Sequence, residues 1–299
     1  MSALVFEFIA AFGGGIFGAA IGALPAFILT GVVAIISSIA MMAGVADVTM
    51  GMVAFGSFVG PHVAFAGGVA AAAYARKKGL LENGADIATA LAGLNNAGVL
   101  LVGGIFGILG CGIKTLFGLF MAGNVSTKLV TDLPGITVFF SGIIARLAFG
   151  ERGLGSAIEN KTAGLKNPMN WVWWIGYALV VSCMFVVLVY TTPVAYEAIA
   201  GGYATFIFGL AATGLIFAEV GQGYPGWHHV GLIAALGVIN GYAALGVAGG
   251  ILVGVVCGVI AGILCELETG LINSDVDSHI DGPAFAIFLM TIVVNLIFG

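Results

Sequence analysis

The chain has 299 residues, of which 61% are hydrophobic and only 8% are charged, and its formal net charge is −5. Soluble globular domains carry about 25% charged residues, so this composition excludes them. A membrane β-barrel would alternate in polarity over strands of about ten residues, a pattern that does not occur here. We therefore expect an all-α polytopic membrane protein with the lipid bilayer as its surroundings and no nucleic-acid partner.

Apolar segments of roughly membrane-spanning length follow one another along the chain, since a helix crosses a bilayer with about 20 apolar residues. The first half contains predicted spans at 4–22, 26–45, 52–76, 97–121 and 135–150. The second half contains predicted spans at 171–190, 202–219, 228–246, 247–265 and 283–298. Residues 48–59 and 86–96 are candidates for re-entrant segments. The sequence thus predicts about ten transmembrane helices.

The two halves of the chain resemble each other. The run Asp132-Leu133-Pro134 recurs as Asp281-Gly282-Pro283, and the matches continue at the same offset of 149 residues to Gly150 and Gly299. Two further blocks recur in the same order: Gly103-Gly104-Ile105 as Gly249-Gly250-Ile251, and Gly60-Pro61-His62-Val63 as Trp227-His228-His229-Val230. This pattern indicates an internal duplication. We divide the chain into repeat 1 (1–150), a linker (151–170) and repeat 2 (171–299).

The number of spans per half determines how the repeats are related. Five spans are an odd number, so the second half would cross the membrane in the opposite sense, as in the inverted repeats of secondary transporters. Four or six spans per half would give parallel repeats instead. We expect two inverted five-helix repeats with broken or re-entrant segments.

Basic residues gather in two places. One cluster is Arg76-Lys77-Lys78, and the other is Arg146, Arg152, Lys161 and Lys166. Two predicted spans separate the clusters, so both should lie on one side of the membrane. The positive-inside tendency makes that side cytoplasmic. The expected location is therefore the inner or plasma membrane, with a cytoplasmic linker and both termini outside.

Two histidines follow residues that interrupt helices. His62 follows Gly60-Pro61, and His229 ends the run Gly223 to His229, which contains Pro225. Proline is disfavoured within a helix and favoured in its first turn, so we expect a helix break at both places. Broken helices expose backbone groups that bind ions or substrates near the bilayer centre. The alternative is an ordinary turn at the membrane interface.

Polar side chains near these breaks complete the predicted substrate or ion site. Asp132 and Asp281 each precede a proline that opens an apolar span, so each either caps a helix or binds a coupling cation or proton. Asn124 and Asn273 share the offset of 149 residues and could supply amide oxygens, and Glu219 precedes the second break. The oxygen-rich run 273–280 resembles part of a hard-cation loop without the EF-hand spacing, and we interpret it as a solvated loop.

The sequence contains no phosphate-binding loop, nucleotide fingerprint or nucleophile elbow, and its four cysteines lack metal-ligand spacing. We therefore predict neither an enzyme nor a cofactor. The leading hypothesis is a secondary transporter, coupled to Na⁺ or H⁺, that moves a small solute or ion. The alternatives are an ion or small-solute channel and a membrane subunit of a larger complex. The glycine-rich helices are equally compatible with a homo-oligomer.

Overall fold

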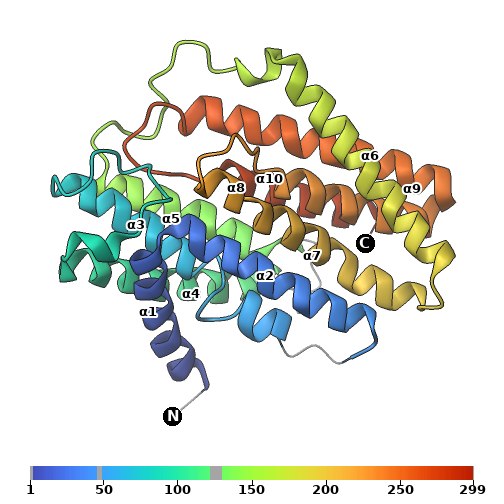
Figure 1. Cartoon of the computed structure of the whole chain (residues 1–299), viewed down its shortest axis with the longest axis horizontal. Coiled ribbons are helices and arrows are strands. Elements are labelled where there is room, and N and C mark those ends of the chain that lie inside the picture. Colours follow the sequence, from blue (N-terminus) through green and yellow to red (C-terminus); the bar gives the residue numbers. More distant parts are fainter. Residues whose placement is uncertain (1–2, 46–48, 122–129, 299) are drawn as a thin grey trace.

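The computed structural model describes residues 3–45, 49–121 and 130–298, and within these residues every regular element is a helix (Figure 1). The first half consists of α1 (Ala3–Ile21), α2 (Ala23–Met42), the π-helical turn η1 (Met50–Ala54), α3 (Ala64–Lys77), the 3₁₀ turn η2 (Leu91–Leu94), α4 (Ala97–Met121) and α5 (Leu133–Phe149). The second half consists of the 3₁₀ turn η3 (Gly164–Lys166), α6 (Pro168–Thr191), α7 (Tyr196–Gly214), α8 (Ile216–Glu219), α9 (His228–Ile272) and α10 (Gly282–Phe298).

The helices have the length and composition of a membrane protein. Among the described residues, six segments are long and apolar enough to cross a bilayer: α1, α2, α4, α6, α7 together with α8, and α9. The helices α5 and α10 are apolar but shorter, with 17 residues each. Several long apolar helices therefore form one bundle, as the composition predicts.

The long helix α9 is two helices joined by a sharp turn at Gly246, where the backbone has φ 75° and ψ −167°. The two arms fold back on each other: Gly237 faces Gly254 and Cys257, and Gly241 faces Gly250. This confirms the predicted boundary between the spans 228–246 and 247–265, although the second arm continues to Ile272.

We expect Gly246→Ala to lower the free energy of unfolding by about 1–3 kcal/mol, because residues other than glycine rarely adopt this backbone conformation. The cost is conformational, since no atom lies within 4 Å of a methyl group added there. Gly201→Ala is the matched control, because Gly201 is an exposed helical glycine of α7 with ample space. Unfolding by a denaturing detergent measures both, and equal stability of the two variants would contradict the prediction.

Both predicted helix breaks occur. After η1 the chain makes turns through Gly60-Pro61-His62, and α3 begins at Ala64. After α8 it makes turns to Trp227, and α9 begins at His228. The predicted span 52–76 is therefore not one continuous helix. Residues 86–96 form turns and η2, and the Ile87 carbonyl accepts a hydrogen bond from the Leu24 amide at the start of α2 (2.8 Å).

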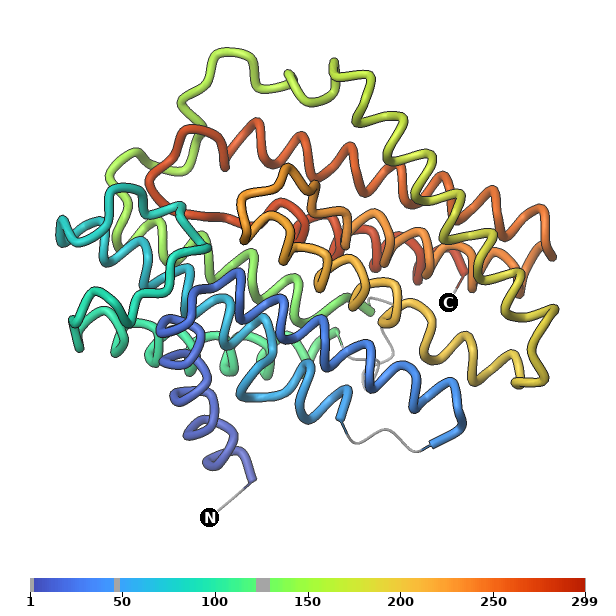
Figure 2. The backbone as a smooth tube through the Cα atoms, in the orientation of Figure 1, coloured from blue at the N-terminus to red at the C-terminus, as the bar shows by residue number. Residues whose placement is uncertain are grey.

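The two halves pack against each other along α2 and α7, which lie side by side, and along α5 and α10 (Figure 2). Within the halves, α1 packs on α4 and α6 on α9. At one end of the bundle, the Lys77 ammonium donates to the Ala148 carbonyl at 2.8 Å, and Arg76 pairs with Glu151 at 2.9 Å. The two basic clusters thus lie at the same end, as predicted, and we call it the basic end.

Candidate functional site

Two cavities of about 380 Å³ each lie where the broken segments meet the starts of α5 and α10. Cavity 1 is lined by residues of α2, η1, α4, α5, α7, α9 and α10, and cavity 2 by residues nearer the starts of α2 and α6 and the end of α9. Four residues line both cavities and form what we call the partition: Phe27, Phe65, His228 and Asp281.

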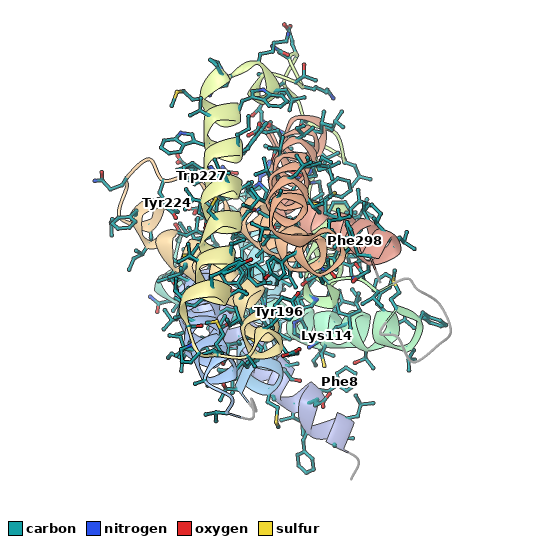
Figure 3. All side chains as sticks on the ribbon, turned by 90° about the vertical axis from the view of Figure 1, so that its right-hand side faces the viewer. Phe8, Lys114, Tyr196, Tyr224, Trp227 and Phe298 are labelled. Carbon is teal, nitrogen blue, oxygen red and sulfur yellow. The ribbon has the colours of Figure 1, made fainter. Side chains whose placement is uncertain are left out.

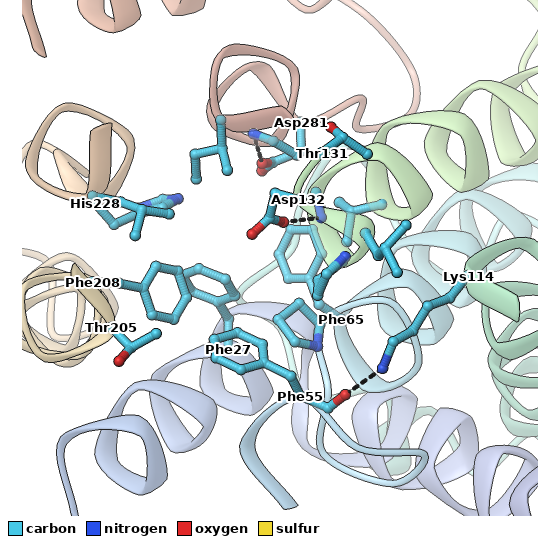
Figure 4. A pocket seen from close by; sticks show the side chains of 18 of the residues that line it. Phe27, Phe55, Phe65, Lys114, Thr131, Asp132, Thr205, Phe208, His228 and Asp281 are labelled. Carbon is cyan, nitrogen blue, oxygen red and sulfur yellow. Dashed lines mark hydrogen bonds between the residues drawn. The ribbon is translucent and has the colours of Figure 1, made fainter. Parts of the chain in front are cut away.

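Asp132 caps α5 and also faces cavity 1. Its Oδ1 accepts a hydrogen bond from the Gly135 amide at 2.6 Å, as an N-cap carboxylate does. The carboxylate lies in the middle of the cavity, between the wall of α5 and the rings of Phe27 and Phe208 (Figure 4). The capping interpretation is therefore confirmed for Asp132, and the same side chain is placed to meet a ligand.

Asp281 has the same local role and a different environment. Its Oδ2 accepts from the Ala284 amide at 2.7 Å, so it caps α10 as Asp132 caps α5. Its Oδ1 lies 3.0 Å from Nε2 of His279, a pair whose side chains are each 15% exposed. The residue that corresponds to His279 in repeat 1 is Val130, so Asp132 has no such partner.

The segment 273–280 is a folded connection and not the solvated loop that its polar composition predicts. Asn273 organises it, because its Oδ1 accepts from the Ile280 amide at 2.8 Å and its Nδ2 lies 3.4 Å from Nδ1 of His279. Val276, Asp277, Ser278 and Ile280 are buried. The error arose because contacts with α5, which is distant in sequence, exclude water from this segment.

The predicted histidines occupy different places. His62 is 1% exposed and lines neither cavity; its backbone carbonyl lies directly against Gly110 of α4. His229 lines cavity 2, and its buried Nδ1 has no hydrogen-bond partner among the described residues. The neighbouring His228, which was not a predicted site residue, lines both cavities.

The remaining predicted residues contribute unequally. Asn273 lines cavity 2 with Asp281 and His229. Glu219 ends α8 and lines neither cavity. Asn124 lies outside the described residues. The structure therefore brings together Asp132 and Asp281 at cavity 1, and Asp281, His229 and Asn273 at cavity 2.

Lys114 is a residue of the site that the sequence reasoning missed. It lies on α4, lines cavity 1, and its ammonium donates to the carbonyl of Phe55 at 2.6 Å, just beyond η1 (Figure 4). Lys114 could have been found from the sequence, because it is the one charged residue within the predicted span 97–121. Charged side chains at membrane depth are costly and usually functional.

Aromatic side chains hold the second break against the bundle. Tyr224 and Trp227 lie beside α6 (Figure 3), and the ring of Trp227 is 4.8 Å from that of Trp173 on α6. Trp227 also lines cavity 2. These contacts position the first turn of α9, and with it His228 and His229.

The site offers no preformed metal centre. Within the described residues, no group of three or more histidine, cysteine, aspartate or glutamate side chains is arranged to hold a metal ion. The acidic and basic side chains that line the cavities are instead three carboxylates, three imidazoles and one ammonium: Asp132, Asp281, Glu266, His228, His229, His279 and Lys114.

Comparison with known proteins identifies a family. The family described as DUF7973, a family of unknown function, matches residues 1–166 and 171–299. The chain belongs to this family. No curated protein and no solved structure matches the chain. Family membership thus supplies no activity for the chain.

Proposed function

We propose that this protein is a secondary transporter of the inner or plasma membrane that moves a small solute or ion by alternating access. The observation that carries the proposal is the pair of cavities of equal volume, separated by the four residues of the partition. A transporter needs a central site that opens to each side in turn, with a barrier that moves from one face of the site to the other.

The cavities extend in different directions from the partition. Cavity 2 is lined by Ile87 and Asn170, which belong to segments at the basic end. Cavity 1 is lined by Gly51 of η1 and by Lys114 in the second half of α4, which runs away from the basic end. The basic end is the cytoplasmic one under the positive-inside tendency. Cavity 2 would then lead to the cytoplasm and cavity 1 to the outside.

Contacts between equivalent positions support two inverted repeats. Phe139 and Phe288, which are 149 residues apart, lie with ring centroids at 5.7 Å. Arg146 on α5 binds the segment that leads into α10, and the equivalent Asn295 on α10 donates to Val130, in the segment that leads into α5 (3.2 Å). Such reciprocal contacts are expected of two copies related by a two-fold axis, which lies in the membrane plane when the repeats are inverted.

The two carboxylates that line cavity 1 support coupling to a cation. Asp132 and Asp281 come from the two different halves and both line cavity 1. An Na⁺ ion or a proton bound there changes the charge of the site and thereby the relative stability of the two open states. A ligand shifts such an equilibrium only through its different affinity for the two states.

Side-specific cysteine labelling tests alternating access. We expect Gly51→Cys in cavity 1 and Ile87→Cys in cavity 2, each in a cysteine-free background, to react with an impermeant maleimide from opposite sides of the membrane. The Gly51 position has room for a side chain, because no atom lies within 4 Å of an added Cβ. A change in pH or Na⁺ that raises labelling at one position should lower it at the other.

Two exposed positions serve as controls. Val45→Cys after α2 and Lys78→Cys after α3 should each react from a single side under every condition, because both residues lie at bundle ends. Reaction of both cavity positions from either side would indicate a continuous pore and hence a channel. Labelling that is independent of every ion would count against cation coupling.

A further inference from the structure

Cavity 1 has an aromatic wall. The ring of Phe27 lies 5.6 Å from that of Phe65, 5.5 Å from that of Phe208 and 4.9 Å from the imidazole of His228. A fourth phenylalanine, Phe55, lies 5.6 Å from Phe208. All of these residues line the cavity. Aromatic faces attract a cation that comes within about 6 Å of the ring centroid, especially where water is excluded.

Within the described residues, one carboxylate oxygen in this cavity has no hydrogen-bond partner. Asp132 uses one oxygen for the Gly135 amide, and its other oxygen makes no hydrogen bond with a described residue. Asp281 differs, because one of its oxygens binds the Ala284 amide and the other binds His279. Of the two carboxylates at the cavity, Asp132 is therefore the one that needs a positively charged partner.

Lys114 attracts Asp132 electrostatically but is not paired with it. Its ammonium is directed at the Phe55 carbonyl, and no ion pair joins Lys114 to Asp132 among the described residues (Figure 4). The opening between Asp132 and the aromatic wall is left to a ligand. A neutral ligand there would leave a half-buried carboxylate without an ion-pair partner, and an anion would be repelled by it.

A divalent metal cation fits this cavity poorly. Hard cations such as Ca²⁺ take six to eight oxygen ligands, and smaller ones such as Mg²⁺ demand an octahedral set. Few side-chain oxygens line the cavity: besides Asp132 and Asp281 there are the hydroxyls of Thr131 and Thr205, which also bond to the Phe288 carbonyl at 2.9 Å and to Ser38 at 2.8 Å. Most other lining residues are apolar.

We infer that cavity 1 binds an organic ammonium ion with an apolar body, with Asp132 as its counter-ion and Phe27, Phe65 and Phe208 around its apolar part. The inference rests on the proposed transport function and names the substrate class for it. The cavity volume of about 380 Å³ lies within the range of small-molecule sites. His228, whose Nδ1 has no hydrogen-bond partner among the described residues, adds a second polar group at the partition.

The test compares three probes with the same body and different head groups: phenethylammonium, 2-phenylethanol and phenylacetate. Calorimetry and thermal unfolding of the purified full-length protein in detergent measure their binding. We expect phenethylammonium alone to bind and to raise the unfolding temperature. Asp132→Asn should weaken its affinity at least tenfold, and Phe208→Leu should weaken it several-fold.

Matched controls keep this test decisive. Asparagine also caps helices well, so Asp132→Asn should fold, and its unfolding temperature without ligand checks this. Asp275→Asn, at an exposed aspartate paired with Arg152, should leave affinity unchanged. Equal binding of 2-phenylethanol, or an Asp132→Asn variant with full affinity, would overturn the inference.

A fourth arm separates this inference from the proposed function. Stabilisation by Na⁺ and not by phenethylammonium, lost in Asp132→Asn, would make Asp132 an inorganic-cation ligand and reject the organic substrate class. Opposite-sided cysteine labelling in that case would leave the transporter proposal standing. Loss of opposite-sided labelling would reject the transporter even if the ammonium ion bound.

Discussion

Arg146→Ala is expected to lower the free energy of unfolding by about 3–5 kcal/mol. Arg146 lies on α5 with only 1% of its surface exposed. Its guanidinium donates to the Ser278 hydroxyl at 2.8 Å, to the Ser278 carbonyl at 2.6 Å, and to the Ile272 carbonyl. Alanine would leave these buried acceptors without donors, which costs far more than the loss of a solvated contact.

Other variants separate the hydrogen bonds of Arg146 from its charge. Arg152→Ala is the control, because Arg152 has a side chain 50% exposed and pairs with Asp275 on the same segment, so it should cost about 1 kcal/mol or less. Arg146→Lys should lose less stability than Arg146→Ala and more than Arg152→Ala, because lysine keeps the positive charge but lacks the planar set of donors of a guanidinium. Detergent-induced unfolding measures the stability of all three variants. Equal losses of unfolding free energy in the two alanine variants would show that the buried hydrogen bonds of Arg146 do not stabilise the fold.

The substitution Arg146→Ala is also expected to affect ligand binding at cavity 1. Arg146 holds residues 272–278, which lead directly to His279 and then to Asp281 of the partition. We therefore expect Arg146→Ala to weaken ligand binding at cavity 1 even at temperatures where it remains folded. Arg152→Ala should bind normally.

Gly18→Ala is expected to lower the free energy of unfolding by about 3 kcal/mol or more. Helix α1 packs on α3 and α4 through glycines, and the backbone of Gly18 lies against Ala64. A methyl group at Gly18 would overlap the Ala64 carbonyl oxygen and lie 2.8 Å from the Ala64 Cα. The obstructing atoms belong to the backbone, so no side-chain rotation relieves the clash and α1 has to move.

The control for Gly18 is a glycine with space around it. Gly176 is exposed on α6, and no atom lies within 4 Å of a Cβ added there. Gly176→Ala should therefore stabilise the helix by up to about 1 kcal/mol, the difference in helix propensity between the two residues. Opposite signs for the two substitutions are the expected result of unfolding measurements, and a neutral Gly18→Ala would contradict the close approach of α1 and α3.

The helices could be located from the sequence because each helix is specified by residues close to it in the chain. The predicted span 97–121 coincides with α4, and the predicted boundary after residue 246 coincides with the turn in α9. The breaks before α3 and α9 also occur where glycine and proline interrupt apolar runs. The length of an apolar run and the residues that end it depend on neighbours a few positions away, so they can be read without a structure.

The same reasoning recovered part of the site. Asp132 and Asp281 were found through their equivalent positions before a proline, and both cap a helix and line cavity 1. His62 was chosen by the same logic as His229, yet it lines neither cavity, and its backbone carbonyl lies against α4. Spacing alone does not tell on which side of a turn a side chain emerges.

The sequence by itself therefore determined an all-helical chain with long apolar segments, their breaks and the doubled pattern of capping aspartates. Only the tertiary structure decided which of these groups meet. The partition joins Phe27 of α2, Phe65 of α3, His228 of α9 and Asp281 before α10. Their meeting depends on how helices far apart in sequence cross and rotate against one another. That geometry comes from the fit of glycine-lined backbones and buried side chains, which no local pattern encodes.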